Sequence, residues 1–375
     1  MKTIIQQEPL HFGLQMAYRA LSSGTTHPIL TGILLTAQEG IIHLAATDLE
    51  KSIEVVIPAS VEQPGSLVLP GREFNEIINR IPGGDITLSA PEDQHQAVIS
   101  WRASEFVLNG YPADQFPPLP TPEDGQSFHL PAAALENALS KTVYAASQDD
   151  SMPIISGVRL TLQEGMLQAT STDGYRIAVC DTELPIEYPG ELEVVLPRRG
   201  ISDLLRILAS AGDDDVELAL SENHIFLRLN TGIHYSMVVL EGRYPDVLSM
   251  VPGASDFNTH VTFDRDEFIG ACSRTALLAD DRKGARPVHL HIQDERLIFK
   301  AQSPELGEAY DEIEAQIEGD PLAILFQSKY LLDGIKHISD DRVRFSFTDA
   351  ENAAQLQGID SSEFSYIVLP MKPRQ

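Results

Sequence analysis

Several groups of histidine and acidic residues have types and spacings that could support metal-dependent chemistry. His289 and His291 alternate within an apolar stretch, so on a strand both imidazoles would face the same side, as two zinc ligands do. No third ligand follows at the usual spacing. The acidic runs at 149–150, 213–215 and 280–281 could contribute to a two-metal phosphoesterase. All three fall between predicted elements, where runs of like charge are usually solvated.

Motifs with a known catalytic mechanism are absent from the sequence. It contains no G-x-x-x-x-G-K-[ST] phosphate loop, no G-x-S-x-G nucleophile elbow and no H-E-x-x-H zinc motif. Cys180 and Cys272 lack C-x-x-C spacing and fit a reducing compartment. We therefore predict no catalytic residue, no metal, no cofactor and no enzymatic activity. The alternative, a metal-dependent hydrolase of phosphoesters, would need clustered Asp, Glu and His that break the internal repeat.

Segments that target or anchor a protein are also missing. The N-terminal residues lack the apolar stretch and the small-residue cleavage site of a secretion signal. No apolar run approaches the length of about eighteen residues that a membrane-spanning helix needs. We expect a cytoplasmic protein that does not associate with a membrane.

The strands and helices that would position a functional site recur along the chain with a period of about 125–130 residues. Residues 28–48 and 153–173 share ten identical residues over twenty-one positions, at an offset of 125. Both windows read as a strand, a tight Gln-Glu-Gly turn and a second strand that ends at Thr-Asp. A third, weaker copy runs from 288 to 299. The sequence therefore predicts three copies of one structural unit.

Each copy is predicted to contain two amphipathic helices, because apolar residues recur at i, i+3 and i+4. The six ranges are 9–22, 70–81, 131–147, 197–210, 264–279 and 327–338. Short turns between the alternating strands favour antiparallel pairing. Pro-rich segments follow the first and second copies and are natural linkers. We predict an α+β fold of three similar domains, each with two helices and antiparallel sheets, over 1–125, 126–255 and 256–375.

Basic residues are concentrated in the predicted helices although the chain as a whole is acidic. The sequence has 55 acidic and 27 basic residues and a net charge of −28. The six helices contain eleven basic and eight acidic residues, so they carry +3 and the remaining chain carries −31. Helices accept Lys, Arg and Glu about equally, so helix propensity does not explain this excess. If the helices line one surface, that surface suits loose, sequence-independent contact with duplex DNA.

The expected domain size favours a ring of two chains. A domain of this length has a radius of gyration of roughly 14 Å and a diameter of ~36 Å. Three such spheres in a ring enclose a hole of only ~6 Å, whereas six enclose ~36 Å by the same geometry. Duplex DNA, about 20 Å wide, passes only the larger hole. We therefore expect head-to-tail assembly into a six-domain ring dimer, with a three-domain scaffold of no closed shape as the simpler alternative.

Short motifs connect the sequence to a known family. Residues 172–178 read Thr-Asp-Gly-Tyr-Arg-Ile-Ala and match T-D-G-[HY]-R-[LI]-A, and residues 366–371 match Y-[VI]-V-[ML]-P-[ML]. Segments 141–147 and 241–246 are similar as well. On these residues the chain resembles, along its whole length, the beta subunit of bacterial DNA polymerase III, the sliding clamp. The resemblance implies a processivity factor, either the housekeeping clamp or a specialised paralogue, that encircles and slides on duplex DNA.

The resemblance also implies a hydrophobic pocket between the second and third domains that binds short peptides of partner proteins. The partners would be DNA polymerase III subunits, the clamp loader and other proteins with a clamp-binding motif. The matching positions are Ile155, Thr172, Gly174, Tyr175, Arg176, Ile177, Pro245, Val247, Met250, Tyr330, Leu369, Pro370 and Met371. The apolar members would form an adaptable cleft, with polar handles from Tyr175 and Arg176. An ordinary hairpin turn at 172–174 and an edge strand at 369–371 are the simpler interpretations.

Two further sets of residues follow from the resemblance. The candidates for DNA contact are Arg72, Arg80, Lys141, Gln148, Arg198 and Arg199. The joint of a homodimer would bring Phe106 and Leu108 of one chain against Leu277 and Leu278 of the other. The alternatives are solvated surface charges for the first set and ordinary core residues for the second.

Overall fold

The computed structural model describes residues 1–22, 24, 26–91, 95–122, 127–149, 151–185, 190–221, 223–281 and 284–372. The chain forms two compact units. Unit 1 consists of Met1–Glu136 and Arg199–Val239, and unit 2 consists of Asn137–Arg198 and Leu240–Gln375. The expected domain boundary at 125 and 126 lies outside the described residues, and the boundaries at 125 and 255 stay a prediction. No helix of the described residues is long and apolar enough to cross a membrane.

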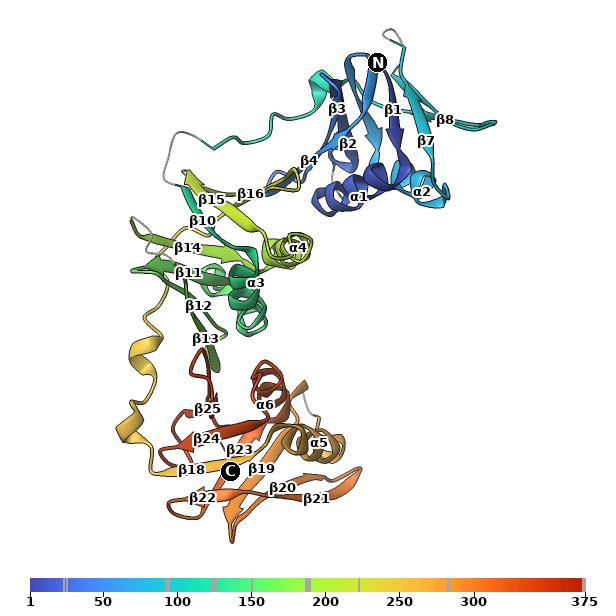
Figure 1. The fold of residues 1–375 in the computed structure, drawn as a ribbon. Coiled ribbons are helices and arrows are strands. Elements are labelled where there is room, and N and C mark those ends of the chain that lie inside the picture. The colour runs from blue at the N-terminus through green and yellow to red at the C-terminus, as the bar shows by residue number, and fades with distance from the viewer. Residues whose placement is uncertain are drawn as a thin grey trace. The chain divides into compact units, whose positions relative to one another are not determined.

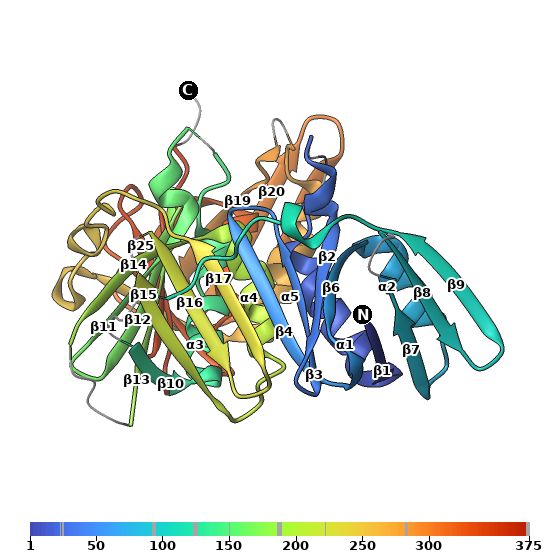
Figure 2. The ribbon, with the colours of Figure 1, turned by 90° about the horizontal axis from the view of Figure 1, so that it is seen from above.

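Unit 1 is built on two antiparallel sheets, as Figures 1 and 2 show. Its strands are β1 (Lys2–Gln6), β2 (Gly32–Gln38), β3 (Ile41–Thr47), β4 (Lys51–Pro58), β5 (Ser60–Gln63), β6 (Gly65–Pro70), β7 (Asp85–Ser89), β8 (Gln96–Trp101), β9 (Ser104–Asn109), β10 (Ser127–Pro131), β15 (Asp215–Ser221), β16 (His224–Leu229) and β17 (Ile233–Val238). The strand orders among the described residues are β5-β1-β7-β8-β9 and β10-β15-β16-β17-β4-β3-β2-β6.

Unit 2 repeats this plan. Its strands are β11 (Gly157–Gln163), β12 (Met166–Thr172), β13 (Arg176–Glu183), β14 (Leu192–Pro197), β18 (Thr259–Asp264), β19 (Pro287–Gln293), β20 (Arg296–Ser303), β21 (Gly307–Glu314), β22 (Gln316–Glu318), β23 (Leu322–Gln327), β24 (Arg342–Phe347), β25 (Ala354–Gly358) and β26 (Phe364–Val368). In the described part of the chain the orders are β14-β11-β12-β13-β26-β25-β24-β18-β22 and β21-β20-β19-β23.

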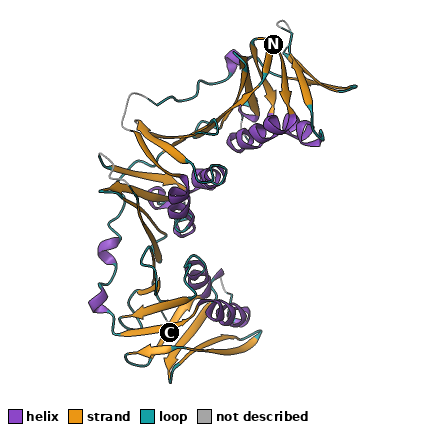
Figure 3. Ribbon diagram, viewed as in Figure 1, coloured by secondary structure: helices purple, strands orange, loops and turns teal. Residues whose placement is uncertain are grey.

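The helices occur where the apolar periodicity predicts them, but the first helix of each copy is shorter than expected. The α-helices are α1 (Gln7–Ala17), α2 (Gly71–Arg80), α3 (Ala132–Ser140), α4 (Arg198–Leu208), α5 (Arg265–Thr275) and α6 (Ser328–Ile335). The 3-10 helices are η1 (Tyr18–Ala20), η2 (Pro28–Thr31), η3 (Ala113–Gln115), η4 (Val143–Ala145), η5 (Pro153–Ser156), η6 (Leu248–Met250), η7 (Ala254–Asp256) and η8 (Ala276–Leu278). Figure 3 shows α1 and α2 side by side along the strands of unit 1, and α5 and α6 together in unit 2.

A change from α-helix to a 3-10 turn explains why the first helix of each copy is shorter than predicted. The predicted helices 9–22, 131–147 and 264–279 each end in such a turn, at η1, η4 and η8. At the end of α3, Thr142 Oγ1 donates to the main-chain oxygen of Ala138 at 2.7 Å. This bond satisfies a terminal carbonyl that a longer helix would use, and 3-10 turns are common at helix ends.

The repeated strand–turn–strand is confirmed in all three copies. The hairpins β2–β3, β11–β12 and β19–β20 pair antiparallel through two-residue turns. Both turn residues have positive φ in each case: 51° and 84° in the first, 51° and 78° in the second, 51° and 58° in the third. Such turns match the natural twist of antiparallel strands. The first two copies use Glu-Gly, whereas the third uses Asp294 and Glu295.

The two large sheets join strands from different copies of the repeat, which the sequence did not predict. In unit 1, β4 of the first copy pairs antiparallel with β17 of the second. In unit 2, β13 of the second copy pairs with β26 of the third. We call these two pairings seam 1 and seam 2. Because each seam continues a sheet across the predicted domain boundary, the second copy is shared between the two compact units.

The core is apolar and, in unit 2, rich in aromatic side chains. Phe263 and Phe268 stack with centroids 4.7 Å apart, and Phe299 meets Phe268 edge-on at 5.1 Å. All three are fully buried, as is Phe345 nearby. Burying a phenylalanine side chain contributes about 1.5–3 kcal/mol, so this cluster anchors α5 to the sheets.

Candidate functional site

The loop between β12 and β13 presents Tyr175, one of the exposed residues of the predicted pocket. Thr172 Oγ1 donates to the main-chain oxygen of Arg176 at 2.7 Å and accepts from the Gly174 amide at 3.0 Å. Asp173 Oδ1 accepts from the amide of Tyr175 at 3.0 Å. Gly174 has φ of 87°, which suits a residue without a side chain. This tight turn directs Tyr175 outward, with 61% of its surface exposed.

Arg176 begins β13 and is buried rather than available at the surface. Its Nε donates to Asp173 Oδ2 at 2.9 Å, and its Nη1 donates to Asp333 Oδ2 at 2.7 Å. Burial by itself would lower the pKa of Arg176, but Tyr366, Asp333 and Asp173 outweigh it and raise that pKa. The polar handle expected from Arg176 is therefore already engaged within the chain.

A second aromatic residue lies beside Tyr175. The Tyr330 ring, on α6, stacks with Tyr175 at 6.3 Å between centroids and 24° between planes. The guanidinium of Arg176 lies 4.5 Å from the Tyr330 ring centroid. Tyr175 and Tyr330 form an aromatic wall, and the guanidinium of Arg176 is held over the Tyr330 ring because the negative face of the ring attracts the cation.

Apolar residues of the predicted pocket form a small cluster of their own. Ile155 and Val247 are buried together with Val195 and Tyr244, and Ile177 packs against them. The amide of Val247 donates to the Pro245 oxygen at 2.8 Å, so this segment turns tightly. Val195 and Tyr244 were not predicted, although their positions in a strand and beside Pro245 are visible in the sequence. Ile177 of this cluster directly follows Arg176 in β13, and Arg176 lies over the Tyr330 ring.

The C-terminal segment is tied to the same loop. The amide of Leu369 donates to the Tyr175 oxygen at 2.9 Å, and the amide of Met371 donates to the Leu325 oxygen at 2.7 Å. Leu369 is exposed, Pro370 and Met371 are partly exposed, and Met250 on η6 is 73% exposed. Exposed apolar residues, when they form a continuous patch, are typical of sites that bind partners.

The predicted DNA-contact residues differ in how much surface they offer. Arg72 and Arg80 on α2 are 75% and 79% exposed and share the carboxylate of Glu76. Arg199 and Gln148 are exposed, and Arg198 is partly exposed. Lys141, in contrast, pairs with Glu363 at 3.3 Å and is only 12% exposed. Lys141 therefore offers little surface to a phosphate.

A basic residue occupies the second position of the second helix in every copy. These residues are Arg72 in α2, Arg199 in α4 and Lys329 in α6. Cations near a helix N-terminus oppose the helix dipole and cost about 0.3–1 kcal/mol. Their recurrence favours a role outside helix stability. Lys329 lies outside the set of residues that the resemblance implies for DNA contact.

The predicted dimer residues lie at or beside two end strands. Phe106 and Leu108 belong to β9, and Phe106 is exposed. Leu277 and Leu278 belong to η8, which contacts β20 and β21, and Leu277 is 68% exposed. In the described part of the chain, both β9 and β21 are the last strands of their sheets. An unpaired strand edge with exposed apolar side chains beside it can pair with a strand of another chain.

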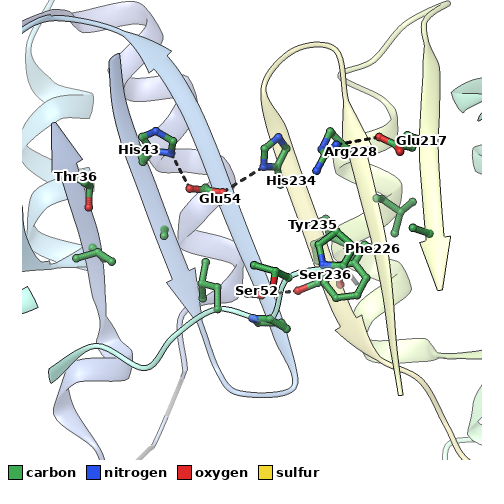
Figure 4. A pocket seen from close by; sticks show the side chains of 18 of the residues that line it. Thr36, His43, Ser52, Glu54, Glu217, Phe226, Arg228, His234, Tyr235 and Ser236 are labelled. Carbon is green, nitrogen blue, oxygen red and sulfur yellow. Dashed lines mark hydrogen bonds and ion pairs between the residues drawn. The ribbon is translucent and has the colours of Figure 1, made fainter. Parts of the chain in front are cut away.

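A cavity of about 760 Å³ lies on unit 1, over the sheet face that includes seam 1. Figure 4 shows its polar side chains: Glu54 of β4 lies between His43 and His234, and Ser52 faces Ser236. The distances from the Glu54 carboxylate to the two Nδ1 atoms are 2.7 and 3.2 Å. Hydrogen bonds from His234 and His43 lower the pKa of Glu54 to about 2, against the opposing effect of burial.

The residues that could have supported catalysis are dispersed. Within the described ranges, no group of three or more His, Cys, Asp or Glu side chains could hold a metal ion. His289 and His291 lie on β19 with ring centroids 6.4 Å apart. Burial raises the pKa of Cys180 to about 11 and that of Cys272 to about 12, so neither thiol is an activated nucleophile. Asp150, in one acidic run, lies outside the described residues.

Comparison with known proteins gives one consistent family over the whole chain. Three family models match in order: the DNA polymerase III beta subunit N-terminal domain at 1–120, the central domain at 129–246 and the C-terminal domain at 250–372. The chain belongs to the DNA polymerase III beta subunit family. The beta sliding clamp of Bacillus subtilis is 32% identical over 99% of this chain and 100% of its own length. That of Synechococcus elongatus is 31% identical, with complete coverage of both chains.

Solved structures of the family agree in fold. A Bacillus subtilis DNA polymerase sliding clamp has a TM-score of 0.94 at 32% identity, with full coverage of both chains. A Pseudomonas aeruginosa sliding clamp bound to griselimycin has a TM-score of 0.93 at 27% identity, again with full coverage. The predicted α+β fold of three similar domains is confirmed by these matches. Members of this family are DNA polymerase processivity factors and not enzymes.

Proposed function

We propose that this protein is a DNA polymerase processivity factor that works as a closed homodimer around duplex DNA. The dimer slides on DNA without reading its sequence, and it holds the replicative polymerase and other partners through a hydrophobic peptide pocket on unit 2. The six-domain ring, the pocket residues, the DNA-contact residues and the domain ranges 1–125, 126–255 and 256–375 are parts of this proposal. A cytoplasmic location is a further part of it.

The observation that carries the proposal is a strand pairing between successive copies of the repeat. It occurs twice within the chain, and, among the described residues, the equivalent strands of the first and third copies each have an unpaired edge. Seam 1 pairs β4 with β17, and seam 2 pairs β13 with β26. The repeat makes β21 the third-copy equivalent of β4 and β13, and β9 the first-copy equivalent of β17 and β26. Both β9 and β21 end their sheets. A third and a fourth seam, each between β9 of one protomer and β21 of its partner, would leave neither edge open.

Side chains beside these edges support the same joint. Phe106 and Val107 on β9 are exposed, as are Leu277 beside β21 and Tyr310 on it. Apolar side chains on both edges would be buried by the pairing, each contributing about 1.5–3 kcal/mol when fully buried. The sheet formed at the joint would have nine strands, five from one protomer and four from its partner, like the nine-stranded sheet at seam 2.

Contact with DNA would be weak and non-specific. The recurring helix residues Arg72, Arg199 and Lys329 supply positive charge on an acidic chain. Few, exposed phosphate contacts give an affinity that falls with salt and carries no sequence information, which permits sliding. The topological link, and not these contacts, would hold the protein on DNA.

Partner peptides would bind on unit 2, over Tyr175, Tyr330 and the Ile155 cluster. Exposed Met250, Leu369 and Met371 supply flexible apolar contacts for a peptide's hydrophobic anchors. Griselimycin is bound in a solved Pseudomonas aeruginosa clamp, and it would serve as a small-molecule probe of the surface proposed here. DNA polymerase III subunits and the clamp loader are the expected protein partners.

The test is retention of the protein on a nicked circular duplex after loading by a clamp loader. We expect retention on the circle and loss once the circle is cut, because a sliding ring leaves through a free end. Blocking both ends of the cut DNA with bound protein is the matched control and should restore retention. Equal retention on circular and cut DNA would indicate direct binding, and retention on neither would exclude encirclement. Either result would refute the proposed function.

A further inference from the structure

A continuous stack of side chains extends from the exposed pocket wall into unit 2. Its outer end is Tyr175 on Tyr330, followed by the guanidinium of Arg176. On the far side, Arg176 lies 5.5 Å from the ring centroid of Tyr144. Tyr144 stacks in turn on His337, with centroids 4.1 Å apart and planes at 11°. Neither Tyr144 nor His337 was predicted to belong to the pocket.

Hydrogen bonds fix the inner members of this stack. Arg176 Nη2 donates to the main-chain oxygen of Tyr144 at 3.1 Å, so the guanidinium is tied to η4. His337 Nδ1 donates to the main-chain oxygen of Asp333 at 2.7 Å, one turn earlier in α6 and its extension. The Asp333 carboxylate also accepts from Arg176. The stack therefore joins the start of β13, η4 and α6 into one rigid assembly.

The side chain of Tyr144 contributes to the assembly through its ring and not through its hydroxyl. Among the described residues, its buried hydroxyl has no hydrogen-bond partner. Burial is also the main reason that the pKa of His337 is lowered, which keeps its ring neutral near neutral pH. A neutral ring stacks on Tyr144 without adding a charge beside the guanidinium of Arg176.

The equivalent positions at seam 1 hold no such stack. At an offset of 125, Tyr175 and Arg176 correspond to Glu50 and Lys51, and Tyr144 corresponds to Arg19. At an offset of 130, Tyr330 and His337 correspond to Gly200 and Ile207. Seam 1 nevertheless keeps the same backbone pairing and the same turn at its first strand. The stack is therefore dispensable for a seam, which points to a role in the surface that only seam 2 presents.

We infer that Tyr144 and His337 are positioning residues of the partner-binding surface, which hold Arg176 and through it the Tyr330–Tyr175 wall in the conformation that binds a partner. This inference rests on the proposed peptide-binding function of unit 2. Arg176 separates both residues from the wall, so they act without contact to the partner. A wall that is already ordered loses less side-chain freedom on binding, and this raises affinity.

The experiment measures binding of griselimycin to the full-length dimer by titration calorimetry. Tyr144→Ala removes the ring and should weaken binding about tenfold, the effect of freeing one or two side chains. Tyr144→Phe keeps the ring and removes only the unpaired hydroxyl, so it should bind like the wild type. Arg19→Ala, the equivalent truncation at seam 1, is the matched control and should also leave affinity unchanged. Thermal unfolding and dimer mass of each variant establish that it is folded.

A second pair of variants decides the matter if Tyr144→Ala does not fold. His337→Ala removes the innermost ring and should weaken binding about threefold, by the same loss of order. His337→Phe restores a ring that stacks on Tyr144 and should recover most of the affinity. A folded Tyr144→Ala with wild-type affinity, or a His337→Ala with wild-type affinity where the first variant is unfolded, would overturn the inference.

Failure of the inference can be told apart from failure of the proposed function. Tyr175→Ala removes an exposed wall residue and is measured in the same series. If Tyr175→Ala weakens griselimycin binding and Tyr144→Ala does not, only the positioning role is refuted. If wild-type protein does not bind griselimycin, or if Tyr175→Ala binds it equally well, the pocket itself is wrong and the inference falls with it.

Discussion

Seam 1 and seam 2 share a backbone but present different surfaces. In both, a turn of the same construction precedes the first strand: Thr47 and Thr172 each donate to the main-chain oxygen four residues later. In both, a buried tyrosine of the second strand donates to the main chain of a helix, Tyr235 to Gly200 at 3.0 Å and Tyr366 to Tyr330 at 2.8 Å. Main-chain pairing and this buried anchor are therefore common to both seams.

The side chains across the two seams have diverged. Ser52 faces Ser236 in seam 1, where the equivalent positions in seam 2 are Ile177 and Ile367. Glu54, held by two histidines, corresponds to Val179. Seam 1 is therefore polar and lies under a cavity, whereas seam 2 is apolar and adjoins an exposed aromatic wall. The two copies therefore keep the same strand pairing and turn, while the side chains at the seams differ.

The largest expected effect concerns the seam that each protomer leaves open. Leu277→Asp with Leu278→Asp places two charges beside the β21 edge and should convert the dimer to monomer at micromolar concentration. Burying an unpaired charge in an apolar joint costs several kcal/mol, which corresponds to a loss of more than about 100-fold in affinity. Light scattering coupled to size-exclusion chromatography measures the mass.

The matched control for the joint uses a leucine at seam 1. Leu49 is exposed in the turn before β4, and Leu49→Asp should leave the dimer mass unchanged. A dimer that persists in the Leu277 and Leu278 double variant would show that the open edges do not form the joint.

The next effect compares equivalent positions of the two turns. Tyr175→Ala with Met371→Ala should weaken griselimycin binding by about 100-fold, since each side chain contributes roughly 1.5 kcal/mol or more when buried by a ligand. Glu50→Ala changes the residue equivalent to Tyr175 at seam 1 and should have no effect. Fluorescence or calorimetric titration of the intact dimer measures the affinity. An equal loss of griselimycin affinity in the double variant and in Glu50→Ala would mean that the exposed aromatic surface of seam 2 does not determine where the ligand binds.

The smallest effect is on stability and arises at seam 1. The pKa of Glu54 is lowered from 4.5 to about 2, so its contribution to stability is present above pH 4.5 and is lost as pH falls towards 2. Glu54→Gln should reduce the free energy of unfolding at pH 7 by about 1–2 kcal/mol, discounted because the side chain is partly exposed. The difference from wild type should shrink as pH falls below 4.5.

Urea unfolding at fixed protein concentration and a series of pH values measures this difference. Glu193→Gln is the control, because Glu193 pairs with Arg159 at 2.8 Å but is well exposed. That variant should change the free energy of unfolding by less than about 0.5 kcal/mol at every pH. A Glu54→Gln penalty that stays constant with pH would assign it to packing and not to the carboxylate charge.

The repeated elements of this protein can be recognised from local sequence. The offset of 125 residues relates β2, β3 and β4 to β11, β12 and β13 without a shift. Helix positions followed from apolar periodicity, and the tight turns followed from glycine and acidic residues at fixed places. These features depend on neighbours within a few residues, so local sequence carries them. The apolar and aromatic character of the pocket residues was visible for the same reason.

Which copies share a sheet, and which charges remain at the surface, depends on contacts between distant segments of the chain. The seams pair strands that are far apart in the chain, and no local pattern in β4 or β13 names its partner. Arg176 is buried because Asp333 and Tyr144, which belong to other elements, contact it. Lys141 is likewise largely covered because it pairs with Glu363, a residue far along the chain. The type of a residue fixes which hydrogen bonds and ion pairs it can form. Distant segments of the chain decide whether those bonds form within the chain or remain available to a partner.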